Sequence, residues 1–392
     1  MNNNKTKYLL EKLINFNTEN FDDKPSGYTL DFLRFIRKYL KESGIKSKIH
    51  KYDLNKKYDG KIEKIKNRGI LLTEINDSKK PIILLEGHTD TVPIESKNIS
   101  KAICSVKGNI IKGRGAVDMK GSIVSMILAI QELNKNKNLK YQPVLLLTSD
   151  EEANNFAGIK HFLKLQKKHK YNIKFAVCGE PTNFEIKINF YGALYMIIEC
   201  FGKSGHGANK SENENAIENI VPFLNDLLKY QKEISKIRHP QLGYSVMNIG
   251  TIRGGRKVNQ VPSSCVIEFA VRTVKKNNIY LNLFNDIVEN KKILHKTTQV
   301  FSYDPICVSS NNKFVSELKK SVLKSGKKSQ FNISKEFSEA TLLNKAGLET
   351  VMFGPGNSVY SHSSNEKINI KDVLLTKEIL VDFLSLSSHS IP

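Results

Sequence analysis

Short apolar runs alternate along the chain with segments that are apolar on one side only. Residues 5–16 and 28–43 carry apolar side chains at helical spacing, and Gly44 follows the second segment, as glycine often follows a helix. Further helices are predicted at 122–133 and 158–166, and buried strands at 47–52, 68–75, 82–87, 143–148 and 175–178. This order predicts an α/β fold in which helices cover both faces of a mixed, largely parallel sheet.

Near residue 187 the pattern changes to strands with one polar face. Such strands are predicted at 186–190, 193–201, 245–252 and 263–273, with one long helix at 215–234. After about residue 305 the earlier alternation resumes, with helices at 311–325, 339–346 and 371–385 and a strand at 349–353. We therefore expect one discontinuous domain, residues 1–186 and 304–392, which is interrupted by a smaller α+β domain at residues 187–303.

Length and composition agree with two globular domains. The chain has 392 residues, of which 40% are hydrophobic, whereas one core seldom serves more than about 250 to 300 residues. No apolar run approaches the ~20 residues that a bilayer crossing needs. The first residues lead into an amphipathic helix and not into the apolar core of a signal peptide. These features predict a cytoplasmic protein that does not bind membranes.

Charge and cysteine content narrow the choice of function. The five cysteines are dispersed and lack C-x-x-C spacing, so we expect reduced thiols and neither a disulfide framework nor a cysteine zinc site. The net charge of +22 would suit nucleic acid or an acidic partner. Because the lysines are spread along the whole chain with many asparagines and isoleucines, we interpret the charge as compositional and do not expect nucleic-acid binding.

Side chains that could bind a metal follow the strand predicted at residues 82–87. His88 and Asp90 stand two residues apart, and residues i and i+2 of a strand point the same way. His88 could bind a metal while Asp90 accepts a hydrogen bond from the second ring nitrogen and so orients the ring. The simpler alternative is a hydrogen-bonded turn, which this pair alone does not exclude.

Four further segments place similar side chains at strand ends or turns. Asp118 stands in a glycine-rich turn before a helix, where it could also be only a helix cap. The acidic run 150–152 follows a buried strand, and it is either a solvated loop or a cluster whose repulsion a cation neutralises. Glu180 ends the next strand, and His362 follows the last strand and turn. Together, two imidazoles and three carboxylates suit two divalent ions, zinc above all, with cobalt or manganese as alternatives.

These segments together resemble the motif set of a known enzyme family. The motifs are Gly87–Pro93, Gly113–Gly121, Asp150–Glu152, Gly179–Thr182 and Gly354–Gly356 with His362. In this order they are similar to the co-catalytic zinc aminoacylase and carboxypeptidase family, which includes acetylornithine deacetylase and succinyl-diaminopimelate desuccinylase. The resemblance implies a zinc-peptidase-like catalytic domain with an inserted dimerisation or lid domain, and hence a homodimer.

The resemblance also implies which residues bind the metal ions. His88 and Glu180 would hold one zinc ion. Glu152 and His362 would hold the other ion, and Asp118 would bridge both.

Two neighbours of these ligands would take part in other ways. Glu151 would be the general base, which takes a proton from the attacking water and passes it to the leaving amine nitrogen. Asp90 would orient His88. Family members carry a cis peptide after the bridging aspartate, so we expect the bond between Asp118 and Met119 to be cis.

In the inserted domain, three residues match functional positions of the family. His206 lies in Gly202–Gly207, which resembles the segment whose histidine reaches the partner subunit's active site and stabilises the tetrahedral oxyanion; otherwise it is an ordinary loop histidine. Asn259 and Arg272 match positions that bind the substrate's amide and carboxylate. The planar guanidinium of Arg272 could pair both carboxylate oxygens, or it could form a surface ion pair.

We therefore expect hydrolysis of the amide bond of an N-acyl amino acid, with acetylornithine deacetylation as the first choice. The alternatives within the class are desuccinylation of succinyl-diaminopimelate, a dipeptidase, and release of lysine or ornithine from an acidic carrier protein. The connection between Pro93 and Gly113 is short and lacks tryptophan, whereas many deacetylases and desuccinylases have a longer aromatic segment there. A short connection is also seen in relatives of the last kind. Outside the class, the alternative is a basic binding protein whose acids are structural. A serine hydrolase is disfavoured because no G-x-S-x-G motif is present.

Overall fold

The chain forms two compact units. The computed structural model describes residues 2–21, 30–58, 61–75, 80–94, 104–136, 138–152, 156–209, 211, 214–289 and 291–386. The start of the second predicted helix, residues 28 and 29, and most of the connection after Pro93, residues 95–103, lie outside these ranges. The first unit comprises Met1–Ile188, Val308–Asn332 and Ser338–Pro392, and the second comprises Asn189–Cys307 and Ile333–Phe337. Residues 304–307 and 333–337, which the sequence pattern assigned to the first domain, belong to the second unit, and residues 187 and 188 belong to the first.

In the part of the chain that the structure describes, the largest sheet has nine strands, most of them in the first unit. Its order is β1-β2-β6-β3-β7-β19-β8-β17, with β18 beside β8. The central strands β6, β3, β7 and β19 are parallel, whereas β1, β2, β8 and β17 pair antiparallel. Parallel strands end at the same edge of a sheet, so the residues that follow these four strands lie close together.

The strands of this sheet contain the apolar runs that the sequence pattern predicts. The bounds are β1 (Ser47–Tyr58), β2 (Lys61–Thr73), β3 (Ile82–His88), β6 (Gln142–Thr148), β7 (Ile173–Cys178), β8 (Ile186–Phe190), β17 (Ile306–Cys307), β18 (Phe331–Ser334) and β19 (Thr350–Met352). Every residue of β3 is buried, as expected for a strand with a helix layer on each face.

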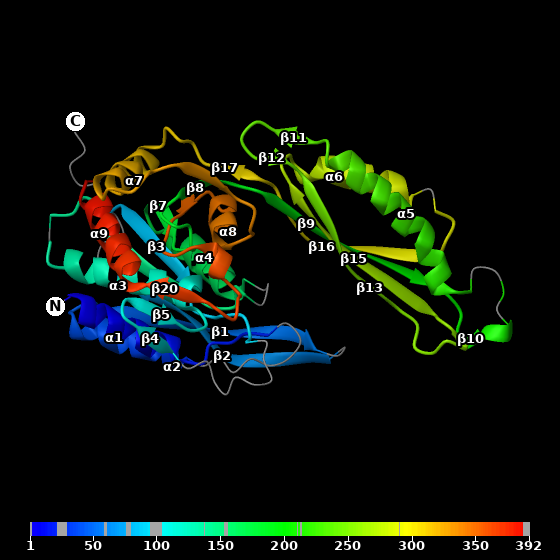
Figure 1. The fold of residues 1–392 in the computed structure, drawn as a ribbon, viewed down its shortest axis with the longest axis horizontal. Coiled ribbons are helices and arrows are strands. Elements are labelled where there is room, and N and C mark those ends of the chain that lie inside the picture. The colour runs from blue at the N-terminus through cyan, green and yellow to red at the C-terminus, as the bar shows by residue number, and fades with distance from the viewer. Residues whose placement is uncertain are drawn as a thin grey trace. The chain divides into compact units, whose positions relative to one another are not determined.

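Helices cover both faces of this sheet, which confirms the predicted α/β class. Figure 1 shows α3 and α9 on one side of β3, and α4 and α8 on the other. Helix α3 is apolar nearly all round and is buried, because α1 and α9 pack on it from outside the sheet. The bounds are α1 (Asn2–Ile14), α2 (Asp31–Glu42), α3 (Gly121–Leu133), α4 (Ala157–His169), α7 (Lys313–Lys324), α8 (Glu339–Lys345) and α9 (Ile370–Leu386).

The second unit is an antiparallel sheet with helices on one face. Its strand order is β13-β15-β9-β16, and α5 and α6 pack against it. Alternate residues of β15 are buried, so one face of the sheet meets the helices and the other does not. The bounds are β9 (Gly192–Phe201), α5 (Ala216–Ile234), β13 (Val246–Gly254), β15 (Ser264–Thr273), α6 (Asn277–Val288) and β16 (His295–Tyr303).

Several elements escaped prediction. Helix α6 and strand β16 were not predicted, although Tyr280, Phe284 and Val288 of α6 are buried and recur at a helical spacing of four residues. Short strands form three small sheets among the described residues. One contains β20 (Lys367–Asn369), β5 (Ile110–Lys112) and β4 (Ser105–Lys107). Another pairs β10 (Gly205–His206) with β14 (Gln260–Val261), and the third pairs β11 (Arg238–His239) with β12 (Gly243–Tyr244). Among the described residues, no helix has the length and apolar character that crossing a membrane requires.

Candidate metal centre

The predicted metal ligands of the first unit follow the central strands, and the fold brings them together. His88 ends β3, Glu152 follows β6, and Glu180 follows β7. Asp118 lies in the irregular helical turn Ala116–Lys120, directly before α3. His362 lies in the segment after β19 and has a left-handed backbone conformation, with φ 61°.

One group of ligand atoms lies around His88 Nε2, which is 3.1 Å from Asp118 Oδ1 and 3.9 Å from Glu180 Oε1. A second group lies around His362 Nε2, which is 3.5 Å from Asp118 Oδ2 and 3.2 Å from Glu152 Oε2. Asp118 thus faces a different histidine with each of its carboxylate oxygens, as a bridging ligand would.

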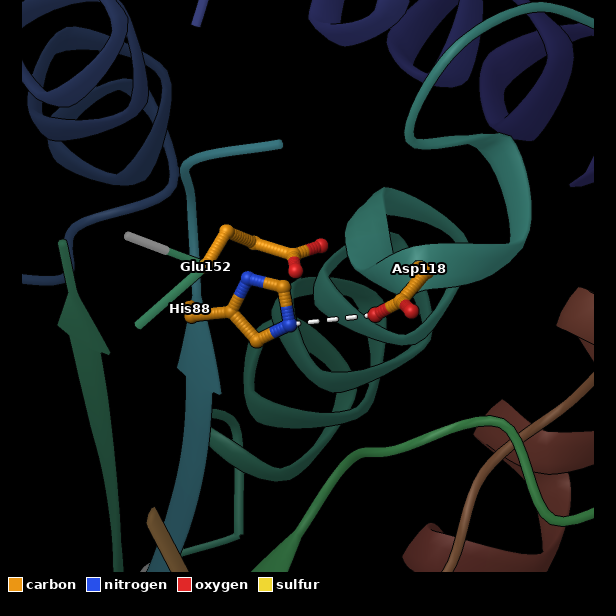
Figure 2. A group of neighbouring side chains, drawn as sticks. All are labelled: His88, Asp118 and Glu152. Carbon is orange, nitrogen blue, oxygen red and sulfur yellow. Dashed lines mark hydrogen bonds and ion pairs between the residues drawn. The ribbon is translucent and has the colours of Figure 1, made fainter. Parts of the chain in front are cut away.

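The donor set and its spacing fit two divalent ions. Figure 2 shows His88, Asp118 and Glu152 converging on one space, and their ligand atoms lie within 4.8 Å of one another. Tetrahedral sites with metal–ligand bonds of about 2.0 to 2.2 Å place ligand atoms roughly 3.3 to 3.6 Å apart. The observed 3.1 to 3.9 Å brackets that range. Imidazole and carboxylate are also the ligands that zinc commonly takes besides thiolate.

Contact between the two histidines and the neighbouring carboxylates shifts the pKa values of both kinds of group. Hydrogen bonds to Asp118 and Glu152 raise the pKa of His362 to about 10. Burial would lower the pKa of His88, yet Asp118, Glu151 and Glu180 raise it well above its usual range. Burial would likewise raise the pKa of Asp118, but hydrogen bonds from the two histidines lower it. Divalent ions would replace these protons, because an imidazole that binds a metal must be neutral.

Glu151, the predicted general base, is a neighbour of these ligands. Removal from water, followed by the negative charges of Glu152, Glu180 and Asp90, raises the pKa of Glu151 well above its usual range, although His88 opposes the shift. A carboxyl group in such a place can both accept and return a proton near neutral pH.

Asp90 differs from the expectation in the oxygen that it offers to His88. His88 Nδ1 lies 3.0 Å from the backbone oxygen of Asp90 but 3.9 Å from its carboxylate Oδ1, which is too far for a hydrogen bond. The carboxylate instead accepts hydrogen bonds from the backbone nitrogens of Glu151 and Glu152, at 3.3 and 3.1 Å, and from Asn20. The physical reason is that β3 ends at His88, so the alternation of a strand does not extend to Asp90.

A buried polar network that the sequence did not reveal supports the same segment. Arg68 Nε lies 3.2 Å from Asp150 Oδ1, and the side chains are each only 1% exposed. Asn20 Nδ2 donates to both Asp150 and Asp90 at 2.9 Å, and Tyr52 Oη donates to Asp150 Oδ2 at 2.9 Å. The first acid of the run 150–152 is therefore a structural partner of Arg68, whereas the other two face the site. The one signal in the sequence was an arginine beside the apolar run of β2.

The remaining predicted residues lie in the second unit. His206 is exposed in β10, which pairs with β14, and the backbone nitrogen of the next residue, Gly207, donates to the oxygen of Asn259 at 2.9 Å. Arg272, on β15, donates to Tyr195 Oη at 3.4 Å, and its guanidinium lies 5.7 Å from the centre of the Tyr195 ring. The substrate-binding roles of these residues stay predictions.

The peptide bond between Asp118 and Met119 is cis, which confirms the expectation of a cis bond after Asp118.

Comparison with known proteins identifies relatives of the whole arrangement. Residues 84–386 match the model of peptidase family M20/M25/M40. The LysW-lysine/LysW-ornithine hydrolase of Sulfurisphaera tokodaii is 29% identical over 321 residues, 80% of this chain and 85% of the relative. That of Saccharolobus islandicus is 29% identical over 327 residues, again 80% and 85%.

Solved structures of the same family have the same fold. An M20-family metallo-carboxypeptidase from Sulfolobus solfataricus superimposes with a TM-score of 0.77 at 16% identity, over 98% of this chain and 99% of the other. A dinuclear metal-binding peptidase of the M20 family from Bacillus subtilis does so with a TM-score of 0.65 at 14% identity, over 99% of each chain.

Proposed function

Because the chain belongs to peptidase family M20/M25/M40 and is thus a metal-dependent hydrolase of amide bonds, we propose that it releases lysine or ornithine from a carrier protein. The observation that supports this substrate is the sequence similarity to LysW-lysine/LysW-ornithine hydrolases, which align with this chain over most of both lengths. The net charge of +22, although we interpret it as compositional, would also suit an acidic carrier. Family membership also decides against the alternative of a binding protein whose acids are only structural.

Acetylornithine deacetylation, the first choice from the motifs, remains a prediction and the second candidate. Both reactions hydrolyse an amide and release ornithine or a similar amino acid. They differ in the acyl part, which is a small acetyl group in one case and a protein in the other. The same active-site chemistry therefore serves both, and only an assay with defined substrates separates them.

The proposed ligands divide into two sets around Asp118. His88 and Glu180 would hold one ion with the first oxygen of Asp118, and Glu152 and His362 would hold another with the second oxygen. When bound, the two ions, for which we propose zinc, would polarise the amide carbonyl and lower the pKa of a water molecule.

Glu151 would move the protons of the reaction. Its carboxyl group lies among the ligands, and its raised pKa lets it accept the proton of the attacking water and hold it. The protonated group would then give the proton to the nitrogen of the departing amino acid, which leaves as a neutral amine. Asp90 would hold Glu151 in place through the hydrogen bond from the Glu151 backbone nitrogen.

We further propose a homodimer formed through the second unit. Ile217, Val221 and Leu228 lie on one face of α5 and are 41% to 45% exposed. Val246 and Ile252 are 52% and 49% exposed on β13, which is an edge strand of its sheet. An apolar helix face and an unpaired strand edge in one unit are typical of a surface that a partner covers.

Residues from the second unit would complete the site. In such a dimer, His206 would stabilise the oxyanion in the partner subunit, and Asn259 and Arg272 would bind the substrate's amide and carboxylate. A cytoplasmic location stays part of the proposal, since both candidate substrates are intermediates of amino-acid metabolism.

One assay tests the proposal. Protein loaded in turn with zinc, cobalt and manganese is mixed with LysW-lysine, N-acetylornithine, N-succinyl-diaminopimelate and a set of dipeptides, and the released amino acid is measured. We expect hydrolysis of the LysW conjugate at a kcat/KM well above that of the other substrates, and none after chelation. Faster hydrolysis of N-acetylornithine would show that the substrate is a free N-acyl amino acid and not a carrier conjugate. No hydrolysis of any substrate with any of the three metals would contradict the proposal.

A further inference from the structure

A buried ion pair lies beside the proposed metal ligands without belonging to them. Arg114 Nη1 donates to Glu366 Oε2 at 2.8 Å, and the two side chains are 8% and 2% exposed. Removing two charges from water is costly, and the cost is offset only where further hydrogen bonds satisfy the remaining polar atoms. Most of the remaining polar atoms are hydrogen-bonded here, chiefly to the backbone of the two segments that carry Asp118 and His362 and also to Pro93. Among the described residues, Arg114 Nε has no hydrogen-bond partner.

Glu366 binds the backbone of the segment that carries Asp118. Its Oε2 accepts a hydrogen bond from the nitrogen of Gly115 at 2.9 Å. Its Oε1 accepts hydrogen bonds from the nitrogens of Val117 and Asp118, at 2.9 and 3.1 Å. These nitrogens begin a helical turn, where backbone N–H groups have no partner within the helix. The carboxylate therefore fixes the position from which the Asp118 side chain extends.

Arg114 binds the backbone of the segment that carries His362. Its Nη2 donates to the carbonyl oxygens of His362 and Pro93, both at 3.4 Å, and its Nη1 donates to that of Ser363 at 3.3 Å. His362 depends on such support more than His88 does. Its side chain is 55% exposed, and it lies outside the sheet, whereas His88 is the last residue of a fully buried strand.

We infer that Arg114 and Glu366 are positioning residues that set the distance between Asp118 Oδ2 and His362 Nε2. The pair joins the backbones of these two ligands through one buried contact, so it controls the metal position that Asp118, His362 and Glu152 share. The position of His88 and Glu180 depends on it less, because His88 ends β3, Glu180 follows β7, and these two strands pair directly. This inference rests on the proposed two-metal site.

The test is the stepwise metal affinity of Glu366→Gln. The glutamine amide keeps the shape of the carboxylate. Its NH2 group, however, would face backbone N–H donors that need an acceptor, and the charge on Arg114 would be left unpaired. Cobalt is titrated into the metal-free protein, and binding is followed by visible absorption and by metal analysis after desalting. We expect one of the two affinities to fall by roughly 10- to 100-fold, the usual effect of losing a partner that orients a ligand, and the other to change by less than about threefold.

Two further variants make the result specific. Lys112→Met is the matched control, because Lys112 Nζ donates to Asn365 Oδ1 at 2.7 Å and so joins the same two segments at the surface without touching a ligand backbone. Its two affinities should equal those of the wild type. Glu366→Gln should also add little to the loss caused by His362→Ala, since both act on the same metal position, but it should add its full effect to His88→Ala.

The outcomes separate this inference from the proposed function. A wild-type protein that binds no cobalt contradicts the proposed two-metal site itself. If the wild type binds two ions and folded Glu366→Gln binds both with unchanged affinity, or loses both equally, only the positioning role is contradicted. Should Glu366→Gln not fold, Arg114→Lys keeps both charges and removes the contacts to His362 and Pro93. If that variant also fails to fold, the pair serves the fold and the inference is wrong.

Discussion

Glu151 and Glu152 are neighbours in sequence with different surroundings. Glu152 Oε2 lies 3.2 Å from His362 Nε2, close enough for both residues to bind one metal ion. Glu151, in contrast, has a raised pKa, because it is removed from water and lies among the negative charges of its neighbours. We expect Glu151→Gln to lower kcat by about 10²- to 10⁴-fold, because the variant cannot accept the proton of water. Metal analysis should still find about two ions per chain, since Glu151 is not a proposed ligand. Substantial activity in this variant would assign the base elsewhere.

The raised pKa values of the two histidines imply that metal affinity depends on pH. The neighbouring carboxylates raise the pKa of His362 to about 10 and raise that of His88 well above its usual range, so metal ions must compete with protons for both rings. Each ion must displace such a proton, so affinity should rise by about tenfold per pH unit for each proton released. Calorimetry in two buffers of different ionisation enthalpy measures the protons released, and His362→Ala should release about one fewer. A pH-independent affinity between pH 6 and about 8 would contradict this assignment.

At the scale of elements, a buried network joins β2 to the segment that follows β6. Because of this network, we expect a substitution outside the proposed site to lower the unfolding free energy strongly. In Arg68→Met, Asp150 would be left as a buried, unpaired charge, which typically costs about 3 to 5 kcal/mol of unfolding free energy. Arg34→Met is the matched control. The ion pair of Arg34 with Asp31 has side chains that are 55% and 59% exposed, and such pairs contribute about 0 to 1 kcal/mol.

Denaturant unfolding followed by circular dichroism measures both variants. An unfolding free energy of Arg68→Met equal to that of Arg34→Met would show that the charge of Asp150 is not buried as described. The effect should exceed that of an ordinary surface substitution even though Arg68 is not one of the proposed metal ligands.

The sequence predicted the strand ends well because strands and ligands leave a local signal. A buried apolar run that stops at a histidine or an acid is visible within ten residues, as at His88 or Glu180. The contacts that hold these side chains in place are not local. Arg68 and Asp150 are separated by 82 residues, and Arg114 and Glu366 by 252, so no pattern along the chain joins them. The carboxylate of Asp90 was misassigned because its role depends on where β3 stops, to within one residue.

The elements that were missed have different causes. Helix α6 carries many asparagines, which weaken a helical pattern even though its apolar positions have the right spacing. Strand β16 is mostly exposed and polar, so no apolar run marks it, and its pairing with β9 determines its conformation. Strands β4, β5 and β20 have only three residues each, which is too short for any periodicity to be read.

At the scale of the whole molecule, the proposed dimer makes the second unit essential for activity. Leu228→Glu places a charge on the apolar face of α5, so we expect the protein to become monomeric and inactive while the metal content of each chain is unchanged. Leu323→Glu, on α7 of the first unit, is the matched control, since Leu323 is also exposed but lies outside that face. Light scattering coupled to gel filtration measures the mass. A wild-type monomer with full activity would contradict both the dimer and the role of His206.

We propose above all that five side chains at one edge of the sheet form a site for two divalent ions. Anomalous diffraction at the zinc absorption edge, from crystals of the zinc-loaded protein, tests it most directly. Two peaks should appear, one contacted by His88, Asp118 and Glu180 and the other by Asp118, Glu152 and His362. A single peak, or peaks that do not involve Asp118, would contradict the account.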